Sequence, residues 1–311
     1  MTVTNAPPSS VPGGPPGAPA QYPLRPAMGQ GRAREVAGTT LWILALCLIG
    51  FALWFVVFSR LFYDRAQADA YANFRGTLQQ AVAPVGPTQP FNPGLLLTPG
   101  TPVALLTVPE IGLNVVVFEG TSGQVLESGP GHVRDTPLPG QAGDSVIEGR
   151  RVTYGGPFGG ITKLRAGDTF TTTTGQGVSH YRVVDMRQSG DPYSFIAGDG
   201  YITLATADGP DLVPSGVVRI DAQLTSKLNA APAMVVTPAD ISPSEYPLGT
   251  DSAALVPLVL WGAALVLAAS TLSWFRRRWG RWQIWIVAVP VMGFLFLSVA
   301  DQAALLLPNI M

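Results

Sequence analysis

Three long runs of apolar residues stand out along the chain, and they cover residues 39–59, 252–275 and 282–307. The first two contain no charged side chain, and the third contains only Asp301. Because a helix of about 20 apolar residues spans the hydrocarbon core of a bilayer, each run predicts a transmembrane helix. The first run follows a long arm and precedes Arg60, which favours a retained anchor over a cleaved signal peptide.

The arginine positions predict the orientation of these helices. Residues 276–281 read RRRWGR and form a short loop between the second and third runs. Short loops rich in arginine stay in the cytoplasm. Residues 1–38 are rich in Pro and Gly and net basic, so we predict a disordered cytoplasmic arm. The sequence therefore predicts a multi-pass plasma-membrane protein with a cytoplasmic N-terminus and residues 60–251 outside the cytoplasm.

The region outside the membrane divides into three parts. Residues 60–100 predict a stalk helix followed by a Pro/Gly linker, and residues 226–251 predict a second linker. Between them, in residues 101–225, short β-type runs alternate with Gly, Pro and Asp turns. These runs are residues 103–108, 114–120, 144–149, 168–174, 180–186, 201–206 and 216–224. Their spacing predicts one all-β domain, a barrel or a sandwich.

Composition and charge narrow the functional classes. The chain is 47% hydrophobic and only 13% charged, which agrees with a protein partly in lipid. Its net charge of -1 argues against a nucleic-acid partner, which would require a basic face. The one cysteine, Cys47, lies in the first apolar run, so disulfide frameworks, thiolate zinc sites and iron–sulfur clusters are excluded. We expect no cofactor and no bound metal.

Five sequence blocks follow one another at ordinary spacing in the β region. They read PVALLTVPEIGLNVVVFEG, SGPGHVRDTPLPGQAGDSVIEGRRVTYGGPF, KLRAGD, YITLAT and VVRIDAQL. This order resembles the sortase family, the membrane-anchored cysteine transpeptidases of Gram-positive cell walls. The layout is most similar to actinobacterial sortases of the class E or class C type. The resemblance implies the family's eight-stranded β-barrel for residues 101–225, with an active groove formed by strands and their connecting loops.

The resemblance also implies a catalytic Cys, His and Arg, and this sequence departs from the family at these positions. The family's histidine segment matches GDSVIEGRR, with Arg150 at the histidine position. The strand that ends at the nucleophile matches ITLATA, with Ala207 at the cysteine position. The family's arginine falls at Ser215 or, in a shifted alignment, at Arg219. Because a methyl group cannot attack a carbonyl and arginine does not exchange protons near neutral pH, we predict a catalytically inactive member.

Other polar side chains near these positions are candidate groove residues: Glu148, Arg151, Thr206, Asp208 and Arg219. We expect Arg150 to pair with Glu148 or Asp208 and to fill the space of the missing thiol and imidazole. The same carboxylates support the alternative, because two carboxylates can act as general acid and general base. His132 lies in the GPGH block, away from the nucleophile position, and is expected to be structural.

Two functions follow from these residues. The first is a non-catalytic binding or scaffolding subunit in cell-surface protein sorting or cell-envelope assembly. Its partners would be a sorting-signal peptide or pilin-like surface protein, an active sortase, or another envelope membrane protein. The alternative is a transpeptidase or hydrolase that uses a relocated, carboxylate-based mechanism on the same fold.

Overall fold

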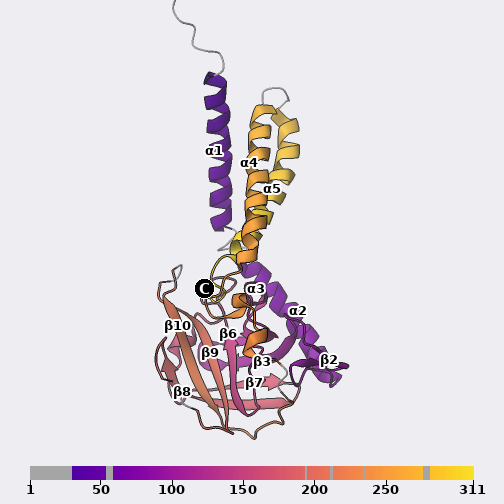
Figure 1. Cartoon of the computed structure of the whole chain (residues 1–311), viewed down its shortest axis with the longest axis vertical. Coiled ribbons are helices and arrows are strands. Elements are labelled where there is room, and N and C mark those ends of the chain that lie inside the picture. The colour runs from indigo at the N-terminus through magenta and orange to yellow at the C-terminus, as the bar shows by residue number, and fades with distance from the viewer. Residues whose placement is uncertain (1–29, 54–58, 193–194, 211–212, 234–235, 276–280) are drawn as a thin grey trace, which may run out of the picture.

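The computed structural model describes residues 30–53, 59–192, 195–210, 213–233, 236–275 and 281–311. Three long helices, α1 (Gln30–Leu53), α4 (Leu255–Phe275) and α5 (Arg281–Leu305), lie together at one end of the molecule, and a barrel lies at the other (Figure 1). Most of the predicted disordered arm and of the predicted arginine loop, residues 1–29 and 276–280, lies outside the described residues.

Eight strands form a closed barrel in the order β10-β8-β7-β3-β4-β5-β6-β9, which confirms the barrel implied by the family resemblance. The strands are β3 (Pro102–Val108), β4 (Leu113–Glu119), β5 (Gly131–His132), β6 (Gly143–Glu148), β7 (Thr169–Thr174), β8 (Gly177–Arg187), β9 (Gly200–Asp208) and β10 (Gly216–Leu224). Seven of them coincide with the predicted β runs. The eighth, β5, has two residues and closes the barrel between β4 and β6.

Strand β9 carries Ala207, which the sequence blocks align with the family's nucleophile. It runs parallel to β6 on one side and antiparallel to β10 on the other, and it is buried from Gly200 to Ala207. Successive side chains of a strand point to opposite faces. Ile202 and Leu204 therefore enter the main hydrophobic core, whereas Thr203, Ala205 and Ala207 lie on the other face.

The helices at the other end of the molecule pack against one another. The rings of Trp261 on α4 and Phe294 on α5 pack edge to face, with 5.7 Å between their centroids. Thr40 of α1 donates a hydrogen bond to Ser273 of α4. By length and composition, Ser252–Phe275 and Ile286–Leu305 could cross a membrane, and the apolar part of α1, Ala37–Gly50, is shorter. Helix α1 begins at Gln30, before the predicted boundary at residue 39, because the residues just before the apolar run include good helix formers and continue its helix.

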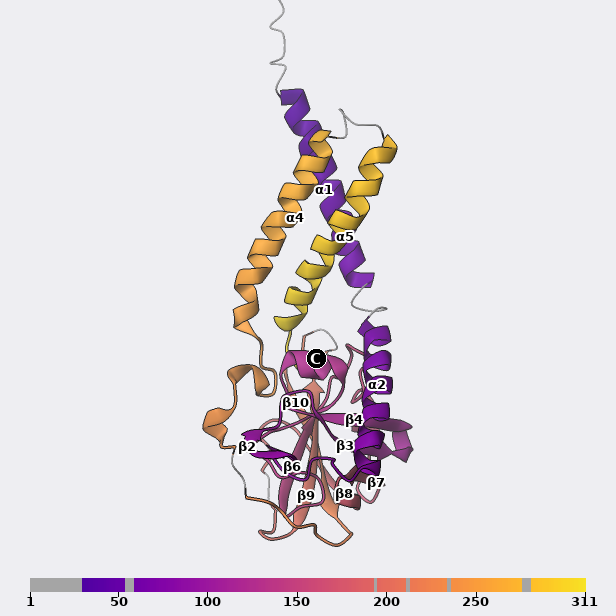
Figure 2. The ribbon, with the colours of Figure 1, turned by 90° about the vertical axis from the view of Figure 1, so that its right-hand side faces the viewer.

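The predicted stalk helix, α2 (Ser59–Gln79), does not stand free but lies along the barrel (Figure 2). The Gln67 amide donates to the carbonyls of Val116 (3.1 Å) and Ser128 (2.9 Å), and its carbonyl accepts from the Val116 N–H (2.7 Å). Ala70 and Phe74 are buried on the same side of the helix. The predicted linker after it contains a small hairpin, β1 (Thr88–Gln89) and β2 (Asn92–Leu96).

Short helical turns complete the structure. They are α3 (Gly123–Ser128) and the 3-10 turns Pro109–Ile111, Ile161–Lys163, Pro238–Asp240, Pro243–Glu245 and Ser252–Ala254. Helix α5 runs toward the barrel, and the chain continues beyond it, so that its last residues lie between the long helices and the strands (Figure 1). The Asp251 N–H donates to the carbonyl of Leu305 (3.0 Å), which joins the start of α4 to the end of α5.

Candidate functional site

Ala207, which the sequence blocks align with the family's nucleophile, lies in a small apolar cluster at the end of β9. The cluster consists of Leu126, Ala205, Ala207, Val217 and Ile310, with the partly buried Leu248 against it. Val217 is directly opposite Ala207 in the β9–β10 register. Among the described residues the free cysteine is Cys47, which lies in α1, outside the barrel. The position therefore presents a methyl group that is covered by aliphatic side chains.

Arg150 is fully buried (0% exposed), although it carries a charged side chain. It donates to Thr153 Oγ1 (3.1 Å) and to the carbonyl of Gly123 (2.9 Å), and its guanidinium lies 4.6 Å from the centre of the Tyr154 ring. Its ion-pair partner is Glu127, at 3.9 Å. Burial lowers the pKa of Arg150 and raises that of Glu127, and in each case the charge of the other residue opposes the shift.

The expected pairing of Arg150 with Glu148 or Asp208 is therefore wrong. Glu148 is the last residue of β6, and the chain leaves the strand at Gly149. A Cβ atom at Gly149 would lie 2.5 Å from the ring of Phe158, so a glycine is required for this close approach. The turn directs Arg150 toward α3, which carries Glu127, and away from the strand face that carries Glu148.

Arg151 and Thr206 fasten the end of β9 to the loop after β6. Arg151 Nη1 donates to the carbonyls of Ala207 (3.3 Å) and Gly209 (2.7 Å), and Thr206 Oγ1 donates to the carbonyl of Gly149 (2.8 Å). These bonds satisfy backbone carbonyls at the end of the strand, where the neighbouring strands no longer provide N–H donors. Both candidate groove residues thus fix the position of the end of β9 relative to the loop after β6.

Glu148 and Arg219 lie level with Ala205 on the two strands that flank β9. Glu148 is 1% exposed, and among the described residues its Oε2 atom has no hydrogen-bond partner. Burial raises the pKa of this carboxyl to about 8, and the positive charge of Arg219 opposes the shift. At neutral pH the protonated form therefore predominates, and it carries no charge.

Asp208 and Ser215 lie at the two ends of the β9–β10 turn. Asp208 Oδ1 accepts from the Gly209 N–H (2.8 Å), and Oδ2 accepts from Gln188 Nε2 (3.2 Å). The Ser215 N–H donates to the carbonyl of Asp208 (2.9 Å). Asp208 also has the opposite strand parity to Ala207, so its side chain leaves β9 on the other face. The structure does not bring Asp208 and Glu148 together as an acid–base pair.

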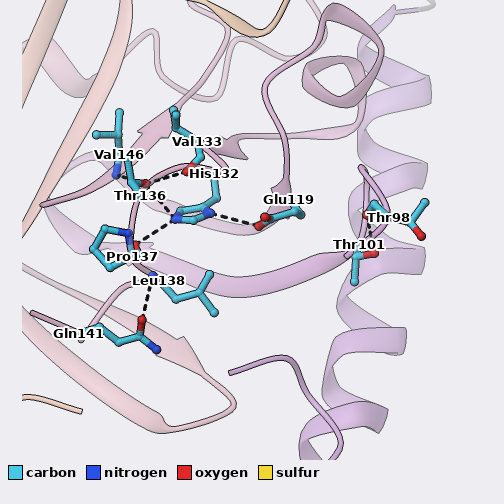
Figure 3. A network of polar contacts seen from close by, with 10 residues as sticks. All are labelled: Thr98, Thr101, Glu119, His132, Val133, Thr136, Pro137, Leu138, Gln141 and Val146. Carbon is cyan, nitrogen blue, oxygen red and sulfur yellow. Dashed lines mark hydrogen bonds and ion pairs between the residues drawn. The ribbon is translucent and has the colours of Figure 1, made fainter. Parts of the chain in front are cut away.

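His132 on β5 is part of a buried polar network that is separated from β9 by β6 (Figure 3). Its Nδ1 lies 3.1 Å from Glu119 Oε2, and its Nε2 donates to the carbonyl of Pro137 (3.0 Å). Thr136 Oγ1 lies 3.1 Å from the same Nε2 and accepts from the Val146 N–H. The ring links β4, β5 and the following loop, which agrees with the structural role expected for it.

One part of the site, the segment after α5, was not expected from the sequence. Residues 308–311 form a turn in which the Met311 N–H donates to the carbonyl of Pro308 (3.1 Å), and Asn309, Ile310 and Met311 are all buried. The Arg151 N–H donates to the carbonyl of Ile310 (3.2 Å), and Thr153 Oγ1 donates to that of Met311 (2.8 Å). The only local signal was Pro308, which ends the helical pattern.

No three His, Cys, Asp or Glu side chains in the described ranges lie close enough together to share a metal ion. The arrangement around Ala207 consists of apolar contacts, backbone hydrogen bonds and one buried cation, Arg150. Such a site can hold a short peptide segment by shape and by its backbone groups.

Comparisons with known proteins agree with this geometry. Residues 106–214 match the family model of the sortase domain. Over 88 residues the chain is 31% identical to Sortase D of Bacillus subtilis (strain 168); the match covers 28% of this chain and 43% of that protein, so it spans less than half of this relative.

Solved sortase structures are also similar. Sortase E from Streptomyces avermitilis is 31% identical; the match covers 42% of this chain and 91% of that one, with a TM-score of 0.37. A Sortase D5 transpeptidase of Clostridium perfringens is 20% identical; the match covers 52% of this chain and 99% of that one, with a TM-score of 0.44.

Proposed function

The chain belongs to the sortase family, and we propose that it is a non-catalytic member that acts as a binding or scaffolding subunit in cell-surface protein sorting or cell-envelope assembly. The observation that carries this proposal is the cluster around Ala207. A sortase reaction requires a thiolate that forms an acyl-enzyme, a group that moves protons, and a donor for the developing oxyanion. Ala207 supplies a methyl group, and Arg150 supplies a cation already engaged by Thr153 and Gly123.

The apolar helices support a role at the membrane. We propose that α1, α4 and α5 anchor the chain in the plasma membrane, with the N-terminus cytoplasmic and the barrel outside. One anchor suffices for an enzyme that reaches the wall, so α4 and α5 add a surface for a membrane partner. The partner classes are an active sortase, another envelope membrane protein, or a surface protein with a sorting signal.

The carboxylate mechanism is the second candidate, and one observation favours it: the raised pKa of Glu148 suits a general acid near neutral pH. Its proposed partner Asp208 is bound to Gly209 and Gln188 and lies on the other strand face. A single buried carboxyl without a nucleophile beside it does not complete acyl transfer. We therefore place this function second.

The catalytic part of the proposal is tested with the full-length chain in detergent and a fluorogenic sorting-signal peptide that carries a Thr–Gly bond. We expect no cleavage, no transfer to an added amine and no acyl-enzyme by mass spectrometry. Cleavage that is lost in Glu148→Gln or Asp208→Asn, but kept in the exposed control Glu110→Gln, would establish the carboxylate enzyme instead.

The binding part is tested by purifying the full-length chain from its native membrane in mild detergent, with a mock purification from membranes without the tagged chain as control. We expect an envelope protein of one of the three partner classes in stoichiometric amount. Recovery of the chain alone would contradict the scaffolding role.

A further inference from the structure

The segment after α5 occupies the place on the barrel where the family's nucleophile position lies. Ile310 is fully buried (0% exposed) in the cluster that contains Ala207, Val217 and Leu126. Its backbone carbonyl accepts from the Arg151 N–H, next to the residue at the histidine position. The side chain of Ile310 thus packs in the cluster that covers the Ala207 methyl group, and residues 308–311 lie over the end of β9.

Asn309 is held by contacts that select a side-chain N–H donor, whereas its Oδ1 atom has no hydrogen-bond partner among the described residues. Its Nδ2 group donates to the carbonyls of Thr121 (2.8 Å) and Tyr246 (3.0 Å) and lies 3.4 Å from that of Ser244. Its backbone N–H donates to the carbonyl of Gly249 (3.0 Å), and the residue is 1% exposed. Because all these partners are acceptors, a carboxylate at this position would face only oxygen atoms and is excluded.

The residue that replaces the family's histidine supports the same segment. Arg150 donates to Thr153 Oγ1, and this hydroxyl in turn donates to the carbonyl of Met311 (2.8 Å). A chain of hydrogen bonds therefore runs from Arg150 to the segment through Thr153. Ala207 shares a cluster with Ile310 of the segment, and Arg150 is linked to Met311 through one intervening residue, Thr153.

We propose that residues 308–311 are a built-in ligand of the groove, and that the groove accepts a short turn-forming peptide with Asn followed by a branched apolar residue once this segment withdraws. The inference rests on the proposed binding function and adds a gate to it, namely residues 308–311, which block the groove until they withdraw. In the docked state the chain's own Asn309 and Ile310 fill the carboxamide and apolar subsites. Because the segment is tethered, a free peptide competes against a high effective concentration and binds weakly to the closed protein.

A disulfide tests the docking. In the full-length chain with Cys47→Ser, the pair Ala207→Cys and Ile310→Cys should oxidise rapidly, because the two side chains belong to one cluster. A protease site placed in the 226–251 segment separates the two halves on a non-reducing gel unless the disulfide joins them. The control pair combines Ile310→Cys with Val178→Cys, an exposed position of β8. No disulfide, or equal cross-linking in both pairs, would overturn the proposal.

Peptide binding tests the exchange. The probe is a fluorescent, amide-capped peptide of residues 306–311, and the proteins are the full-length wild type, Asn309→Asp and the exposed control Asn73→Asp. We expect Asn309→Asp to bind the probe about tenfold or more tightly than the other two, because the segment is released. Equal affinities would overturn the proposal. Cleavage of the probe by Asn309→Asp would instead contradict the non-catalytic function and leave the gate intact, so the two failures are distinguishable.

The oxidised disulfide protein keeps the test independent of folding. Its segment is locked in place, and reduction releases it in the same polypeptide. Adding Asn309→Asp to this protein should give weak probe binding when it is oxidised and tight binding when it is reduced. A variant that has merely lost its fold would show no difference between the two states, and that result would count against the proposal.

Discussion

Replacing Glu148 with glutamine should stabilise the folded chain at neutral pH and have little effect in acid. Glu148 is buried beside Ala205, and burial raises the pKa of its carboxyl from 4.5 to about 8. The folded chain therefore binds a proton that the unfolded chain releases above pH 4.5. The stability contributed by this proton is fully present below pH 4.5 and is lost as the pH rises through 8. Glutamine has the shape of the protonated acid and does not ionise.

The size of the effect follows from the gap between the two pKa values. One pKa unit corresponds to about 1.4 kcal/mol. At pH 7 the unfolded carboxyl is ionised 2.5 units beyond its pKa, so wild type should be less stable than Glu148→Gln by about 3 kcal/mol. At pH 5 the difference should be under about 1 kcal/mol.

Pulse proteolysis in urea suits this measurement, because it reports unfolding of the barrel directly on a gel. Tryptophan fluorescence does not, since all the tryptophans lie in the apolar runs or the arginine loop between them. The midpoints of wild type, Glu148→Gln and the exposed control Glu110→Gln are compared from pH 5 to pH 8. Parallel pH dependences for wild type and Glu148→Gln would refute the reasoning, because Glu148 would then ionise equally in both states.

Three other substitutions test buried contacts in and around the site by the same assay. Arg150→Met should lower the free energy of unfolding by about 3 kcal/mol, because it leaves Glu127 without its cation, and adding Glu127→Gln should restore part of the loss. His132→Ala should cost about 3 kcal/mol, because Glu119 and the carbonyl of Pro137 lose a buried hydrogen-bond partner. Gly131→Ala should lower the urea midpoint of unfolding far more than Gly76→Ala. A Cβ atom at Gly131 would lie 2.1 Å from a backbone oxygen, whereas nothing lies within 4 Å of a Cβ atom at Gly76.

The strands and long helices were predictable because each is a local pattern. Seven strands are runs of six or more residues with β-type composition, and the apolar runs exceed the length of a membrane span. Strand β5 has only Gly131 and His132, too few residues to show alternation. Gln67 illustrates the other kind of miss, because its bonds to Val116 and Ser128 depend on tertiary packing that no pattern in α2 reveals.

The sequence proposes the candidate site as a set of positions, which stay predictions, and it could not give their contacts. The family blocks located Arg150 and Ala207 through short, ordered segments around them. The partner of Arg150 depends on where the chain turns after Gly149, and it is Glu127 on α3 rather than Glu148. Ile310 lies far from Ala207 in the sequence, so their contact arises only from the path of α5 back to the barrel.

With α5 in the membrane, as proposed above, the short connection between α5 and the barrel also limits the distance of the barrel from the membrane. Residues 306–308 alone separate the end of α5 at Leu305 from the docked Asn309, and a chain of this length spans no more than about 14 Å. With α5 in the bilayer, the docked domain is held close to the lipid surface. Its groove can then bind only ligands that are presented at this surface. Release of the segment removes this tether, and the barrel is then held by the connection between α1 and α2 and by residues 226–251, so occupancy of the groove sets how many tethers hold the domain at the membrane.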